Sequence, residues 1–160
     1  MLVKAIQDED FVNYKLPSMF IATCYCDWKC AKDSGFPIEV CQNSHLAHSA
    51  SVDVNDRVIV GRYMQNPITS AIVFGGLEPF CQMEELENII RLFREDGVFD
   101  PIVIYTGYEK QEIETYIKRM QQYPNLIVKF GRYRPGDEPH FDPVLGVKLA
   151  SDNQHAEVIS

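Results

Sequence analysis

SAIVFGGLEPFCQMEELENIIRLFRE, residues 70–95, contains the pattern that decides the fold. It begins with SAIVFGG, an apolar and β-rich run that ends in two glycines, as a buried strand does where it enters a turn. In the following MEELENIIRLFRE (83–95), apolar residues recur at the spacing of one helical face; they are Leu86, Ile89, Ile90 and Phe93. The stretch therefore predicts a strand, a glycine turn and an amphipathic helix.

Similar units lie on both sides of this stretch. A second helix is expected in EKQEIETYIKRMQQY, which places apolar side chains on one face, namely Ile113, Tyr116, Ile117 and Met120. An N-terminal hairpin is expected from LVKAI and FVNYK, and further strands at MFIAT (19–23), PIVIYTG (101–107), NLIVKFG (125–131) and LGVKLAS (145–151). Strands that alternate with such helices predict right-handed βαβ units and a parallel sheet, with active groups at the strands' carboxyl ends.

Length and composition favour one domain over residues 1–160, because a chain of 160 residues with 46% hydrophobic composition can bury one core. The net charge of −8 and the scattered 15 Lys and Arg residues exclude a nucleic-acid surface. No run approaches the roughly 18 apolar residues of a membrane span, and acids near the start argue against a secretory signal. We therefore expect a cytoplasmic protein without a membrane partner.

Most of the cysteines lie in one segment, CYCDWKCAKDSGFPIEVC (24–41), which points to metal binding in a reducing compartment. The segment contains no CxxC pair of the kind found in structural zinc sites. Instead, Cys26-x3-Cys30 and the later Cys41 supply three thiolates, which would leave one corner of a 4Fe-4S cluster open. We favour Cys24 as a small buried residue over a fourth ligand, and Cys81 as a packing residue at a helix start.

Four segments resemble, in the same order, the radical S-adenosylmethionine (SAM) enzymes that activate anaerobic ribonucleotide reductase. They are CDWKC with VCQNS, FGGLEP (74–79), IYTGY (104–108) and LASDNQ (149–154). That family usually reads CxxxCxxC, whereas here ten residues, AKDSGFPIEV, separate the second and third cysteines, and Leu77 is inserted in the GGEP-like segment. The resemblance covers nearly the whole chain.

The resemblance implies an α/β fold with an incomplete (βα) barrel-like parallel sheet of the radical SAM type. It also implies a 4Fe-4S cluster on Cys26, Cys30 and Cys41. SAM would contact a set of residues at the strand ends, which are Val40, Gly75, Gly76, Glu78, Thr106 and Asn153. The enzyme would reductively cleave SAM to methionine and a 5′-deoxyadenosyl radical, which takes hydrogen from a glycine of the reductase or of another glycyl-radical enzyme. A low-potential donor such as a flavodoxin would supply the electron.

Two other functions remain open at this level. One is a radical SAM enzyme with a different substrate, and the other is a non-enzymatic zinc or iron–sulfur module in which Cys24 completes the ligand set. The segment 132–143 is expected to be a surface loop, with a partner-binding or lid role as the alternative. Trp28 either shields the cluster or only packs, and Asn153 and Gln154 either touch SAM or only end a strand. His45 and His48 are expected on the surface.

Overall fold

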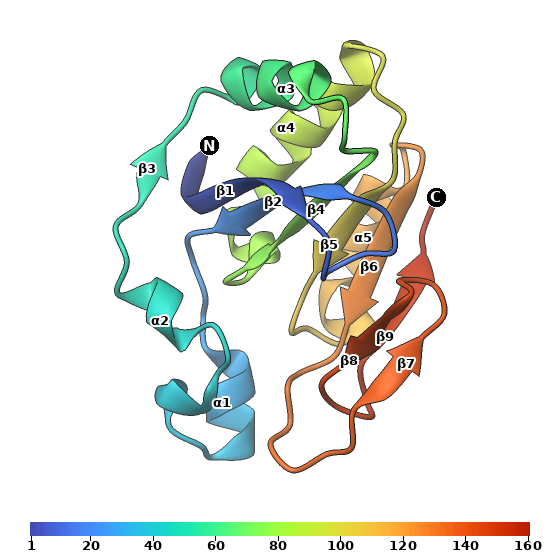
Figure 1. The fold of residues 1–160 in the computed structure, drawn as a ribbon. Coiled ribbons are helices and arrows are strands. Elements are labelled where there is room, and N and C mark those ends of the chain that lie inside the picture. The colour runs from blue at the N-terminus through green and yellow to red at the C-terminus, as the bar shows by residue number, and fades with distance from the viewer.

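A seven-stranded mixed sheet forms the centre of the computed structural model, which describes residues 1–160 (Figure 1). In spatial order its strands are β3 (Val52–Asp53), β1 (Leu2–Asp10), β2 (Ser18–Thr23), β4 (Ala71–Gly76), β5 (Ile102–Tyr105), β6 (Leu126–Phe130) and β9 (His155–Val158). The central strands β2, β4, β5 and β6 run parallel. The outer strands are antiparallel to their neighbours, and the sheet is open because β3 and β9 do not pair.

Helices cover one face of the sheet and contribute to the larger core. They are α3 (Asp56–Gln65), α4 (Met83–Glu95) and α5 (Glu114–Met120), with the 3-10 turns η2 (Pro79–Gln82) and η3 (Lys110–Ile113) before the last two. The expected stripe of α4 is fully buried. The apolar side chains expected on the second helix lie in η3 and α5, and they are buried except Tyr116, which is 40% exposed and stacks on Phe80.

Both faces of the central strands are buried, as the uninterrupted apolar runs indicate. Along β4, Ile72 and Phe74 join the helical core, while Ala71 and Val73 join a smaller core on the opposite face. That second core is closed by the loop after β1 and by a hairpin of β7 (His140–Asp142) and β8 (Val147–Leu149). The hairpin is anchored to the loop where the Lys15 N–H donates to the Leu145 carbonyl at 2.8 Å.

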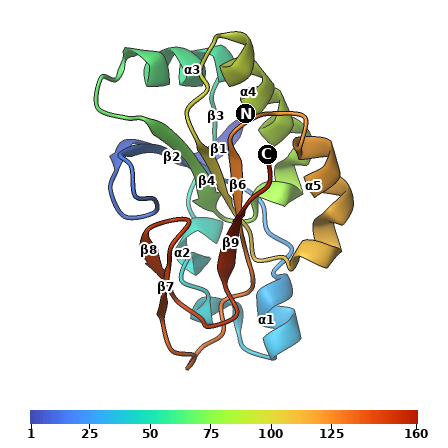
Figure 2. The same cartoon turned by 90° about the vertical axis from the view of Figure 1, so that its right-hand side faces the viewer.

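The cysteine segment forms three short turns of helix at the carboxyl ends of the parallel strands. They are α1 (Lys29–Ser34), η1 (Ile38–Val40) and α2 (Ser44–Ala47). Figures 1 and 2 both place α1, α2 and the β7–β8 hairpin at one end of the molecule and α3 at the other. No residue from Tyr25 to Val58 is buried, so this long segment has little packing of its own.

Two expectations about strands were wrong, and one about a loop was largely confirmed. Residues 11–15 are irregular, so the N-terminal hairpin pairs β1 with β2 and not with FVNYK. The expected last strand at 145–151 contains β8, which pairs only with β7, and the sheet ends instead with β9. The expected surface loop at 132–143 is confirmed up to residue 139, after which the chain enters β7.

Candidate iron–sulfur site

The parallel strands end around a cavity of about 360 Å³, which opens between the cysteine segment and the β7–β8 hairpin. The three cysteines expected as ligands, Cys26, Cys30 and Cys41, line this cavity together. All three are half-buried and unpaired. The parallel register of β2 with β4 and of β5 with β6 brings the segments that follow these strands to one edge. The convergence inferred from the strand order is therefore present.

The other two cysteines lie outside the cavity lining. Cys24 is buried, and its N–H donates to Gln82 Oε1 at 2.5 Å, which agrees with a packing role. Cys81 is exposed and lies 3.9 Å from the Tyr108 hydroxyl.

Local backbone geometry positions the first two thiols. Trp28 adopts a left-handed conformation with a φ of 58°, immediately before α1, and its N–H donates to Cys26 Sγ at 3.3 Å. Burial raises the pKa of Cys26 to about 12 and also raises the pKa of Cys30. Both thiols are therefore protonated near neutral pH, and binding a metal would release their protons.

The three thiols have the chemistry that an iron–sulfur cluster requires, but they are not preassembled into a metal site. No group of three or more His, Cys, Asp or Glu side chains is already arranged to hold a metal ion. The thiols nevertheless share one cavity on a segment without buried residues, so the segment can adjust at low cost. Thiolates are also the ligands that iron–sulfur clusters use.

Glu78 lies at the opposite wall as a buried carboxylate. Its Oε1 accepts from the Thr106 hydroxyl at 2.8 Å and from the Phe80 N–H at 3.1 Å, and its Oε2 accepts from the Gly107 N–H at 2.9 Å. Burial raises the pKa of Glu78 to about 7, and these hydrogen bonds oppose the shift. A methyl group on Gly107 would lie 3.7 Å from both Cys30 Sγ and Glu78 Oε2, so this glycine sits between the cysteine wall and the acid.

Lys129 also lines the cavity and was missed by the sequence analysis. Its ammonium donates to the carbonyls of Gly131 at 2.8 Å and Thr106 at 3.4 Å. Burial lowers the pKa of Lys129 to about 8, although the negative charges of Glu78 and Cys30 oppose this. The sequence offered one indication of this residue, since Lys129 is the only charged residue in the apolar run LIVKF. All five residues of that strand are buried in the structure.

The remaining expected contacts are only partly assembled. Gly75, Gly76 and Thr106 line the cavity, as expected. Val40 does not line it, but Trp28 does. Asn153 lines a neighbouring cavity of about 370 Å³ that also contains Cys30, and its side-chain amide has no hydrogen-bond partner.

Gln154 lines the main cavity. Its side-chain oxygen Oε1 accepts from the backbone N–H groups of Ala150 and Ser151. This residue therefore stabilises the turn between β8 and β9. His45 and His48 are exposed, as expected.

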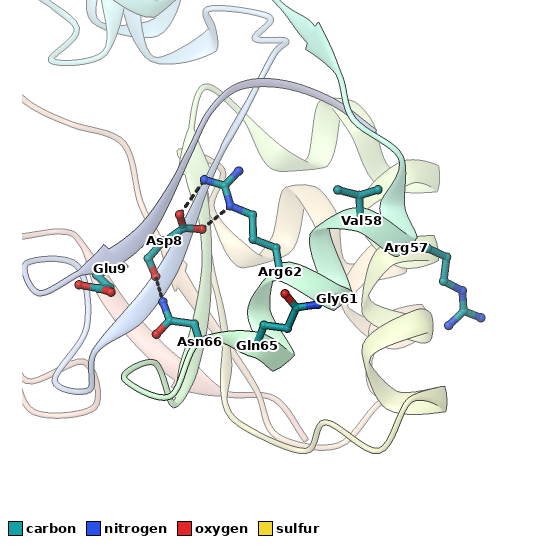
Figure 3. A pocket seen from close by; sticks show the side chains of 8 residues that line it. All are labelled: Asp8, Glu9, Arg57, Val58, Gly61, Arg62, Gln65 and Asn66. Carbon is teal, nitrogen blue, oxygen red and sulfur yellow. Dashed lines mark hydrogen bonds and ion pairs between the residues drawn. The ribbon is translucent and has the colours of Figure 1, made fainter.

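A second groove, of about 560 Å³, lies between β1 and α3 and contains no cysteine (Figure 3). Both of its arginines are already paired, because Arg62 bonds Asp8 and Arg57 bonds Asp96. Asn66 donates to the Asp8 carbonyl at 3.3 Å and so covers part of the sheet edge. This groove is wide and polar, and nothing in it points to chemistry.

An α/β sheet with three unpaired cysteines lining a cavity at its carboxyl edge has the ligand chemistry of an iron–sulfur protein. The chain belongs to the family of 4Fe-4S single cluster domains, whose model matches residues 18–143. The match includes the three cavity cysteines, Glu78 and Lys129. No curated protein and no solved structure matches the chain. None of its helices has the length and apolar character needed to cross a membrane.

Proposed function

We propose that the chain is a cytoplasmic radical SAM activating enzyme, with the open sheet serving as an incomplete barrel of the radical SAM type. Its cluster would be held by Cys26, Cys30 and Cys41. When bound, the cluster supplies the electron that cleaves SAM reductively. The observation that carries the proposal is that these thiols, the glycine pair of β4 and the Glu78 carboxylate face one cavity.

In this proposal, the cysteines of the chain have different roles. Three thiolates leave one iron without a protein ligand, where the amino and carboxylate groups of SAM would bind. Cys24 is not available as a fourth ligand, because it is buried outside the lining.

Glu78 is suited to accept from the SAM ammonium. A carboxylate oxygen has two lone pairs, and Oε2 uses only one of them, on the Gly107 N–H. The other is free for a ligand. Gly75 and Gly76 line the same wall, and their lack of side chains lets the ligand approach the backbone closely.

Adenine would pack against Trp28, which lines the cavity. Val40 would join it only after the cysteine segment closes on the cluster. Thr106 orients Glu78 through its hydroxyl, and Asn153 offers an unpartnered amide beside Cys30. A target glycine of anaerobic ribonucleotide reductase, or of another glycyl-radical enzyme, would enter from the rim formed by residues 31–40 and 132–143. A flavodoxin-type donor would supply the electron.

Anaerobic reconstitution tests the proposal. We expect iron and sulfide in equal amounts, a 4Fe-4S signal in electron paramagnetic resonance (EPR), and 5′-deoxyadenosine after addition of SAM and reductant. Mixing with the cognate reductase should then give a glycyl-radical signal. Zinc without sulfide would identify a non-enzymatic metal module. SAM cleavage without a glycyl radical would identify a radical SAM enzyme with a different substrate.

A further inference from the structure

Lys129 is the one Lys or Arg side chain that is buried. It lies on β6 opposite Tyr105, near the strand's carboxyl end. Both hydrogen-bond acceptors of its ammonium are neutral backbone carbonyls, and no carboxylate lies within ion-pair distance. Burying a charge without an opposite charge costs several kcal/mol, so this position calls for negative charge in the cavity.

That negative charge can come from the cysteine wall. Glu78 is already held by three donors, and Thr106 stands between the two charged groups: its hydroxyl donates to Glu78 and its carbonyl accepts from Lys129. Cys30 lines the same cavity as Lys129, and it would carry a negative charge there once it binds a cluster as a thiolate. A cluster on the three thiolates would place an anionic centre on the cavity side of this ammonium.

We propose that Lys129 is a positioning residue that sets the reduction potential of the cluster. The inference rests on the proposed cluster site, but not on SAM cleavage. Reduction adds one electron, delivered by the low-potential donor, and makes the cluster more negative by one charge. A fixed positive charge in a water-poor wall stabilises that reduced state and raises the potential. No proton needs to move at Lys129.

The test compares Lys129→Met with Lys129→Arg and with Lys148→Met. Lys148 is a matched control because it lines the same cavity but is exposed to water, which screens its charge. Each protein is reconstituted anaerobically, and the cluster is titrated against redox mediators without SAM, with EPR as the readout. In Lys129→Met we expect the ratio of reduced to oxidised cluster at fixed potential to fall at least about tenfold, a shift of about 59 mV. Lys129→Arg and Lys148→Met should remain close to wild type.

Several outcomes would overturn the proposal. One is an unchanged potential in Lys129→Met with normal iron content. Another is an unchanged potential with weakened SAM binding, which would make Lys129 a ligand contact. Lys129→Gln serves as a second neutral variant. If it and Lys129→Met both lose iron while Lys129→Arg keeps it, the positive charge is needed for cluster assembly and the proposal fails. If wild type does not cleave SAM but Lys129→Met still shifts the potential of the cluster, only the proposed enzymatic function is refuted.

Discussion

Replacing Gly76 with Ala should destabilise the fold and the cysteine segment together. Gly76 ends β4 with a φ of +80°, a left-handed conformation that costs about 1–2 kcal/mol for a residue with a side chain. The added methyl carbon would lie 2.8 Å from Ala22 Cβ and 3.0 Å from Ala22 Cα, on the neighbouring strand β2. Ordinary carbon contacts are about 3.5–4.0 Å, so the strands must separate.

The magnitude follows from these two effects. Overpacking of this kind costs about 1–3 kcal/mol, which gives a total of about 2–5 kcal/mol with the backbone cost. Gly97 provides the control, because its φ is +81° but a methyl group there would meet no atom within 4 Å. Gly97→Ala should therefore lose only the backbone cost of about 1–2 kcal/mol.

Urea unfolding of both apoproteins under reducing conditions measures the difference. Iron content after reconstitution gives a second readout, because the new methyl would also lie 3.3 Å from Leu46 Cδ1 in α2, just beyond Cys41. We expect Gly76→Ala to retain less iron than Gly97→Ala. Equal losses of stability and iron in the two variants would refute the argument from contact with β2.

Three further predictions concern the cavity. Replacing any one of the three cavity cysteines with Ala should abolish cluster binding, whereas Cys24→Ala and Cys81→Ala should retain iron; the reverse result would overturn the ligand assignment. The pKa of Glu78 is raised from 4.5 to about 7, so the folded state binds more protons than the unfolded state between these values, and stability falls as pH rises through that window. From about pH 5 to about pH 8, apo wild type should therefore lose up to about 3 kcal/mol relative to Glu78→Gln in urea unfolding, and parallel pH profiles would contradict the shift. Deleting part of residues 134–140 should leave SAM cleavage intact but lower the glycyl-radical signal on the reductase, and an undiminished signal would exclude this loop as a docking surface.

The sequence pattern predicted secondary structure correctly where the burial of a segment follows a regular period along the chain. The central strands and α4 were predictable because long apolar runs and a clear stripe require burial. The helix α3 was missed because its apolar residues do not form one stripe: Ile59 and Val60 are buried, whereas Val58 is 59% exposed. The strand β9 was missed because its four residues, HAEV, depend on pairing with β6.

The residues of the candidate site also fall into those that the sequence could predict and those that it could not. Cys26, Cys30 and Cys41 could be proposed as ligands from spacing and resemblance, and Glu78 could be proposed because it follows a predictable strand. Lys129 could not, because its charge is hidden in an apolar strand and its role depends on which elements face it. The place of Trp28 in the cavity depends on a left-handed backbone that a non-glycine residue seldom adopts.

No residue between Tyr25 and Val58 is buried, and we therefore expect the lifetime of this protein to depend on whether its cluster is present. Residues Val52–Asp53 of that segment are tied to the sheet as β3, whereas the residues before them are held mainly by polar contacts such as Tyr108 with Asp27 and Arg132 with Asp33. Without a cluster, these residues can open while the core stays folded, and a protease can cut the chain there. In the proposed cluster-bound protein, three points of the segment would be tied to one inorganic centre. The lifetime of the protein in a cell should therefore shorten during iron starvation, long before the folded core itself is lost.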